Sequence, residues 1–172
     1  MYREGYGVSQ DYVQATIWWR KAADQGLAEA QSNLGLLYAK GDGVPRDYLQ
    51  AALWFRKAAD QGDALGQANL GKLYADGDGV PQNYPQAAVW WRKAADQGNV
   101  LAQVNLGLLY ERGRGIPQDY ERAHMWFNLA ASRAEDAETL NFAVKNRDAL
   151  AAKMTPAQIA EAQRMAREWV PK

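Results

Sequence analysis

The chain repeats itself with a period of 36 residues over most of its length. Tryptophan recurs at this interval, and so does an acidic or amide residue followed by tyrosine. The copies are Trp18, Trp54, Trp90 and Trp126, and Asp11-Tyr12, Asp47-Tyr48, Asn83-Tyr84 and Asp119-Tyr120. Fixed periods of about 20–50 residues are the signature of proteins built by stacking small units. The sequence therefore predicts a short array of similar units. Positions 36 residues apart are called equivalent below.

Each period carries the pattern of two helices, the first of which is exemplified by residues 27–40. Ala30, Leu34 and Tyr38 are spaced by four residues and lie on one helical face. Gly41 follows, and glycine is the residue that most often ends a helix. At the position equivalent to Ala30 and Ala102 the second period has Gly66. Because glycine is a weak helix former, Gly66→Ala is expected to stabilise the chain.

The second helix of the period begins after Asp47, whose side chain suits a helix N-cap. Ala51, Trp54 and Ala58 share one face of it, and Gly62 ends it. The recurring tryptophans could be a stacking platform for bases or sugars. Their helical phase with small alanines favours a buried seam between helices. Two helices in every period predict an all-α fold.

The register of the period divides the chain into three parts. Residues 10–132 hold the repeats. Residues 1–9 match the end of a first helix and its glycine turn, so we expect them to be the remnant of a truncated upstream repeat. Residues 133–172 lose the repeat signature but keep helical patterns at about 136–153 and 157–168. We expect this last part to form C-terminal capping helices, because the end of a repeat array must be shielded from water.

The same register predicts an exposed aromatic patch near the N-terminus. The helix over residues 11–24 carries Ile17, Trp18, Trp19 and Ala22. In later repeats a preceding first helix would cover part of the equivalent face. Exposed aromatic patches tend to find a partner. The sequence therefore predicts that the chain self-associates through its N-terminal end, or that this end frays.

Composition and residue types exclude several classes of function. Lys+Arg and Asp+Glu are both 20, so the formal net charge is zero, which disfavours nucleic-acid binding. The absence of cysteine excludes disulfides and thiolate metal sites. No apolar run approaches the ~18 residues of a membrane span, and no segment of this chain resembles a signal peptide.

Catalytic constellations are also missing. His124 is the single histidine, and it occupies the position equivalent to Thr16, Ala52 and Ala88. None of the three serines is followed by lysine three residues later, as a serine–lysine nucleophile would require. We therefore expect no enzyme activity, no metal site and no cofactor.

The unit D-Y-x-x-A-x-x-W-x-x-K-A-A-D-Q-G-x-x-x-A-Q-x-N-L-G-x-L-Y-x-x-G-x-G-V-P resembles the Sel-one-like repeat (SLR), a bacterial relative of the tetratricopeptide repeat. The segment from Met154 to Trp169 is also similar to the C-terminal helix of such proteins. The resemblance implies a right-handed α/α superhelical solenoid with first helices lining a concave face. It implies adaptor roles in protein–protein interaction, and an exported or periplasmic location in a bacterium. A few cysteine-rich relatives are linked to penicillin binding, but their cysteines are missing here.

Positions that vary between repeats are free for recognition, and those on the first helices would line the concave face. The apolar stripe of Leu101, Val104 and Leu108 is typical of a groove for a peptide or helix, unless a neighbouring first helix covers it. The predicted partner-binding residues are Leu36, Lys40, Leu65, Ala68, Lys72, Asp76, Leu101, Val104, Leu108, Glu111 and Arg112.

Asparagine recurs before the leucine or phenylalanine of each first helix, as Asn33, Asn69, Asn105 and Asn141. Such a ladder could bind a peptide backbone. Alternatively, each asparagine satisfies backbone groups between neighbouring repeats. The sequence thus predicts a non-catalytic scaffold that binds a protein or peptide along the concave face. The alternatives are a penicillin-binding or peptidoglycan-acting protein, and a passive module of a longer polypeptide.

Overall fold

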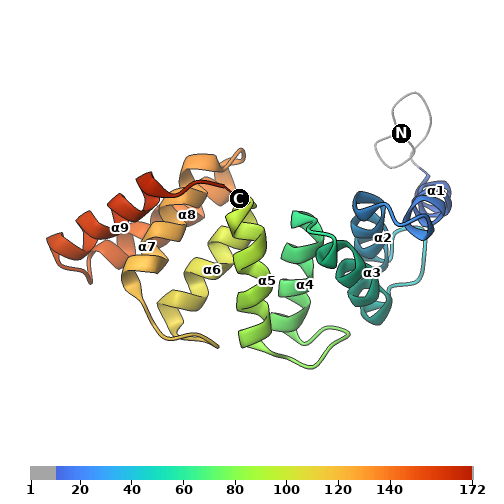
Figure 1. Cartoon of the computed structure of the whole chain (residues 1–172), viewed down its shortest axis with the longest axis horizontal. Helices are drawn as coiled ribbons and strands as arrows, with labels where there is room; N and C mark the ends of the chain where they lie inside the picture. Colours follow the sequence, from blue (N-terminus) through green and yellow to red (C-terminus); the bar gives the residue numbers. More distant parts are fainter. Residues whose placement is uncertain (1–10, 172) are drawn as a thin grey trace. The chain divides into compact units, whose positions relative to one another are not determined.

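The computed structural model describes residues 11–171, which form nine α-helices and no strand (Figure 1). The all-α prediction is confirmed. The helices are α1 (Tyr12–Asp24), α2 (Ala28–Lys40), α3 (Tyr48–Asp60), α4 (Ala64–Asp76), α5 (Tyr84–Asp96), α6 (Val100–Arg112), α7 (Tyr120–Arg133), α8 (Ala137–Ala151) and α9 (Pro156–Glu168). The predicted remnant at residues 1–9 lies outside the described residues.

The helices belong to two compact units, Met1–Asn83 and Tyr84–Lys172. The first unit contains α1–α4 and the second contains α5–α9. Within each unit successive helices pack against each other through α1, α2, α3 and α4, and through α5, α6, α7 and α8. In the second unit α9 packs against α7. We refer to α2, α4, α6 and α8 as the first helices, and to α1, α3, α5 and α7 as the second helices.

Short-range signals position the helix ends where the sequence predicts them. Asp47 caps α3 by accepting a hydrogen bond from the Gln50 amide at 3.0 Å, and Asp119 caps α7 in the same way. Thr155 begins α9 with a capping box, in which its side chain and that of Gln158 bond each other's backbone amides. Each bond satisfies an amide that the first turn of a helix leaves without a partner.

The recurring tryptophans form the predicted buried seam in three of their four copies. Trp54, Trp90 and Trp126 are 6%, 5% and 1% exposed. Trp18 is 55% exposed, as expected for the N-terminal patch. The core around Trp54 also contains the buried Leu34, against which Tyr38 packs. The seam interpretation therefore holds for Trp54, Trp90 and Trp126.

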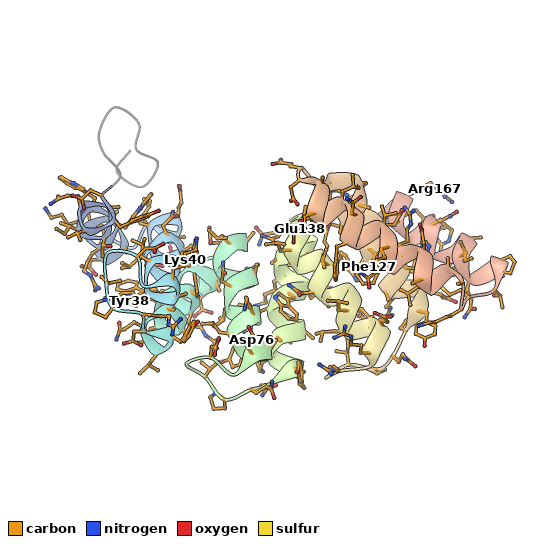
Figure 2. All side chains as sticks on the ribbon, turned by 180° about the vertical axis from the view of Figure 1, so that it is seen from behind. Tyr38, Lys40, Asp76, Phe127, Glu138 and Arg167 are labelled. Atoms are coloured by element: carbon orange, nitrogen blue, oxygen red, sulfur yellow. The ribbon has the colours of Figure 1, made fainter. Side chains whose placement is uncertain are left out.

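The structure explains why leucine is followed by glycine in the first helices. A β-carbon at Gly35 would lie 2.7 Å from the ring of Phe55, and one at Gly107 would lie 2.9 Å from the ring of Phe127. The missing side chain makes room for an aromatic ring of the following second helix. Phe127 and Phe55 are accordingly 0% and 1% exposed, and Figure 2 shows Phe127 among the helices of the second unit.

An arginine two residues after the tryptophan links three helices, which the sequence analysis missed. Arg20 of α1 donates a hydrogen bond to the Tyr38 hydroxyl of α2, and its guanidinium lies 5.6 Å from the ring of Trp54 in α3. Arg92 repeats this arrangement with Tyr110 and Trp126. Cations over aromatic rings contribute roughly 0.5–2 kcal/mol each, so this recurring contact helps hold consecutive helix pairs together.

A buried glutamine makes a second recurring link. Gln31, Gln67 and Gln103 each donate from Nε2 to an alanine carbonyl in the last turn of the preceding second helix, at 3.2–3.3 Å. The same carbonyls also accept hydrogen bonds from the backbone amides of Gly26, Gly62 and Gly98, at 2.9–3.0 Å. The recurring glutamine therefore ties the start of each first helix to the helix before it.

The expectation that Gly66→Ala stabilises the chain is wrong for this structure. A β-carbon at Gly66 would lie 2.8 Å from the Ala58 β-carbon, 2.9 Å from Ser32 Oγ and 3.1 Å from the Ala59 amide nitrogen. Ser32 Oγ is held by a hydrogen bond to Asp63. We now expect Gly66→Ala to lower the melting temperature, because overlap in a packed core outweighs the gain in helix propensity of about 1 kcal/mol. A raised melting temperature would contradict this packing.

Candidate protein-binding surface

In the first unit the variable positions of the first helices lie mostly at the surface. Lys40 ends α2 and Asp76 ends α4, and both are exposed (Figure 2). Leu65 is 37% exposed, whereas Leu36 and Ala68 are half-buried. The first unit therefore offers a mixed polar and apolar face along α2 and α4.

Charges on α4 are paired within the helix. The exposed Lys72 ammonium forms an ion pair with Asp76, one turn later. The hydrogen bond that the Lys72 ammonium donates to the Asp76 carboxylate raises the pKa of Lys72 above its usual value. Exposed pairs of this kind contribute little to stability. The side chains of Lys72 and Asp76 are both exposed to solvent.

In the second unit the predicted apolar stripe is interrupted. Leu101 is 62% exposed and Leu108 is half-buried, but Val104 is 8% exposed. The expectation of a solvent-facing stripe through all three is therefore wrong at Val104. First helices α6 and α8 contact each other, which is the packing alternative that the sequence left open. Glu111 is half-buried and Arg112 is exposed at the end of α6.

Helix α8 adds apolar residues to this face that the sequence analysis did not select. Leu140 is 38% exposed and Val144 is half-buried. They are equivalent to Val104 and Leu108, so continuing the 36-residue register into α8 would have found them. Together, Leu101 and Leu108 of α6 and Leu140 and Val144 of α8 are called the first-helix surface of the second unit.

A hollow and several charged groups border this surface. The hollow has a volume of about 210 Å³ and lies between Val100 and Leu101 at the start of α6 and the α7–α8 connection. Arg133, Glu135 and Asp136 line it, so both signs of charge are present. Glu111, at the end of α6, lies 4.0 Å from the Lys153 ammonium. An apolar patch with a polar rim is the usual composition of a protein-binding site.

Two of the four recurring asparagines make hydrogen bonds within their own helices. Asn33 and Asn69 donate from Nδ2 to the Glu29 and Leu65 carbonyls, at 2.9 and 2.8 Å. Asn33 is 8% exposed, Asn105 is half-buried and Asn141 is exposed. Because their burial differs so much, the four do not present a uniform row. Their role as a peptide-binding ladder stays a prediction.

Groups that could support chemistry are scarce. Within residues 11–171, no three His, Cys, Asp or Glu side chains lie close enough to hold a metal ion. His124 is 3% exposed on α7. Its Nδ1 is buried and makes no hydrogen bond among the described residues. Burial lowers the pKa of the His124 imidazole, the charge of Arg147 lowers it further, and Asp148 partly opposes them.

The lowered pKa of His124 predicts a loss of stability in mild acid. The unfolded imidazole takes up a proton near pH 6.5, whereas the folded one does so only at lower pH. The unfolded state therefore binds more protons as the pH falls below that value, and the free energy of unfolding decreases. We expect His124→Ala, the residue at equivalent positions, to flatten this decrease in chemical denaturation between about pH 7.5 and 5. Equal pH slopes for both proteins would contradict it.

The predicted N-terminal patch is partly exposed. Ile17 is 42% exposed and Trp18 is 55% exposed, whereas Trp19 and Ala22 are half-buried. The Lys21 ammonium lies 4.6 Å from the ring centre of Trp18. Self-association through this patch stays a prediction. Among the described helices, none combines the length and the apolar character needed to cross a membrane.

Paired helices with buried recurring positions and open variable positions define a helical repeat protein. The Sel1 repeat family model matches residues 1–27, 28–63, 64–99 and 100–134. The chain belongs to the Sel1 repeat family, whose members generally act as scaffolds for protein–protein interaction. The predicted SLR resemblance is thereby confirmed. A comparison with curated proteins finds no match.

Two solved structures are similar to the chain. One is c5321, a protective antigen of uropathogenic Escherichia coli strains displaying an SLR fold, with 38% identity and a TM-score of 0.89 over 98% of this chain. The other is a Sel1 repeat protein from Oxalobacter formigenes, with 33% identity and a TM-score of 0.71 over 95% of this chain. The match spans 35% of the c5321 chain and 69% of the other. The fold is thus a helical solenoid of the SLR type.

Proposed function

We propose that the chain is a non-catalytic scaffold that binds a peptide segment or helix of a partner protein on its first helices. The observation that carries this proposal is the contrast between recurring and varying positions. Leu34, Leu70 and Leu106 recur and are 0–1% exposed. Leu101 varies between repeats and is 62% exposed. The fold thus buries these constant leucines and leaves variable apolar side chains such as Leu101 available for recognition.

The second unit offers the better surface for this role. Its first-helix surface combines Leu101 with Leu108, Leu140 and Val144 on two helices that contact each other. Apolar side chains at the spacing of helical turns suit the anchors of an amphipathic helix or an extended peptide. Charged groups at the end of α6 would set the orientation of the partner.

Photo-crosslinking tests the proposal. A photoreactive amino acid at position 108 in the full chain should capture a protein from the native extract, and the captured protein should then be purified. We expect Leu101→Glu to weaken its affinity by about tenfold or more, since a charge is placed in an apolar contact. The matched control is Leu27→Glu, the same change at a leucine that is 55% exposed and lies outside the first-helix surface. Equal affinity of Leu101→Glu and the unmodified chain would overturn the proposal.

The alternative of a penicillin-binding or peptidoglycan-acting protein gains no support. Its test is direct, because a labelled β-lactam either acylates the chain or does not. An exported location and a role as one module of a longer protein stay predictions. Both are compatible with a scaffold.

A further inference from the structure

The second helices carry aliphatic side chains that the fold leaves exposed. On α1, Val13 is 55% exposed, and on α3, Leu49 and Leu53 are 58% and 51% exposed. The equivalent positions of α5 hold Pro85, which is exposed, and Val89, which is 48% exposed. The pattern therefore recurs in three second helices. Contiguous apolar surface of this kind commonly marks a site of interaction.

The fourth second helix shows what can cover such a face. Met125 of α7 is equivalent to Val89 but is 8% exposed, and Leu129, in place of Lys93, is 4% exposed. Helix α9 packs against α7, and its Met165 borders the same hollow of about 600 Å³ as Met125. An amphipathic helix thus lies against α7, where the equivalent positions of the other second helices are open.

Helix α9 is apolar on the buried side and charged on the other. Ala162 and Ala166 are buried, whereas Arg164 forms exposed ion pairs with Glu161 and Glu168. A helix with these two faces can lie along another helix without burying a charge. Helix α9 therefore indicates which kind of segment can pack against the uncovered second helices.

A hollow beside α5 gives this face a definite shape. Its volume is about 550 Å³, and apolar groups dominate its walls. Pro85 and Val89 of α5 form one side, Leu106 and Tyr110 of α6 line it further, and Ile116 of the α6–α7 connection completes it. A hollow of this size accommodates one or two aliphatic side chains of a docked segment.

The charged residues that line this hollow are both basic. They are Arg92 and Lys93. Arg92 is engaged with the Tyr110 hydroxyl and the Trp126 ring. Lys93 is exposed, and its ammonium lies 4.3 Å from the ring centre of Trp90. Positive charge at the rim favours an acidic segment over a basic one.

We propose that the outward face of α5, formed by Pro85, Val89, Lys93 and the adjoining hollow, binds an acidic amphipathic helix of a partner protein. The aliphatic side chains of that helix enter the hollow, and one of its carboxylates pairs with Lys93. This site is separate from the first-helix surface, so it stands whether or not the proposed function does.

The test uses the full chain and two synthetic helical peptides with leucine on one face and either glutamate or lysine elsewhere. We expect the glutamate peptide to bind in calorimetry and the lysine peptide to bind at least about tenfold more weakly. Val89→Glu and Lys93→Glu should each weaken binding of the glutamate peptide by about tenfold. Leu27→Glu, at a leucine that is 55% exposed and lies outside both proposed surfaces, is the matched control and should leave binding unchanged. Circular dichroism verifies that each variant is folded.

Several results would overturn the proposal. The first is that the glutamate peptide does not bind. The second is that neither Val89→Glu nor Lys93→Glu changes its binding. The third is that Leu27→Glu abolishes its binding. Sedimentation with phosphatidylserine vesicles is the remaining arm. Vesicle binding that Val89→Glu removes, without peptide binding, would assign this face to a membrane surface.

Discussion

Gly79→Val is expected to unfold much of the first unit. Gly79 has a φ of +67°, which β-branched residues rarely adopt. A β-carbon there would also lie 2.3 Å from the Tyr48 carbonyl carbon and oxygen and 2.7 Å from the Leu49 amide nitrogen. Because these are backbone atoms, the overlap cannot be relieved by a side-chain rotation. We expect a loss of more than about 3 kcal/mol in the free energy of unfolding, measured by chemical denaturation.

Alanine variants separate the two causes of that loss. Gly62 has a φ of +91°, but nothing lies within 4 Å of its β-position. Gly62→Ala therefore measures backbone strain without close approach, at about 1–2 kcal/mol. Gly79→Ala adds the overlap with α3 and should cost clearly more. Equal losses for the two alanine variants would show that the connection after α4 does not touch the start of α3.

Trp54→Ala is expected to be similarly damaging. The Trp54 side chain is 6% exposed, between the guanidinium of Arg20 at 5.6 Å and the ammonium of Lys57 at 4.0 Å. Removing the Trp54 side chain leaves a cavity, and Arg20 and Lys57 lose their contact with its ring. Substitutions of this type cost about 3–5 kcal/mol in buried cores. Thermal and chemical denaturation of the full chain should both show the loss.

Trp18→Ala is the matched control, because it removes the same side chain from the equivalent position. Trp18 is 55% exposed, so the expected loss is within about 0.5 kcal/mol. Leu108→Ala, on the first-helix surface, should also cost less than Trp54→Ala. A larger effect of Leu108→Ala would mean that scaffold and binding positions are interchanged.

The helix boundaries were predictable because their signals are local. A cap such as Asp47 acts on an amide three residues away, and α3 begins at Tyr48 as the sequence predicts. The prediction of residues 27–40 for a first helix differs from α2 by one residue. Because the chain repeats, helix boundaries that are assigned correctly in one period also apply to the other periods.

Contacts between helices were not predictable in the same way. Gly66 matches two alanines by register, yet the nearby Ser32, where the other periods carry Ala68 and Val104, leaves no space for a methyl group. Val104 looks like a surface residue by its variability, yet it is buried in the second unit. The structural role of Arg20 is not evident from the sequence, because only the folded structure brings it into contact with Tyr38 and Trp54. Each case depends on residues that only the packed helices bring together.

Methyl-resolved NMR of the full chain with its captured partner tests the central claim most directly. The claim is that the variable apolar residues of the first helices form the binding surface. We predict large shifts for the methyl groups of Leu101, Leu108 and Leu140, and small shifts for the buried Leu34 and Leu70. The claim would be contradicted if the partner is bound and the methyl resonances of Leu101, Leu108 and Leu140 do not shift.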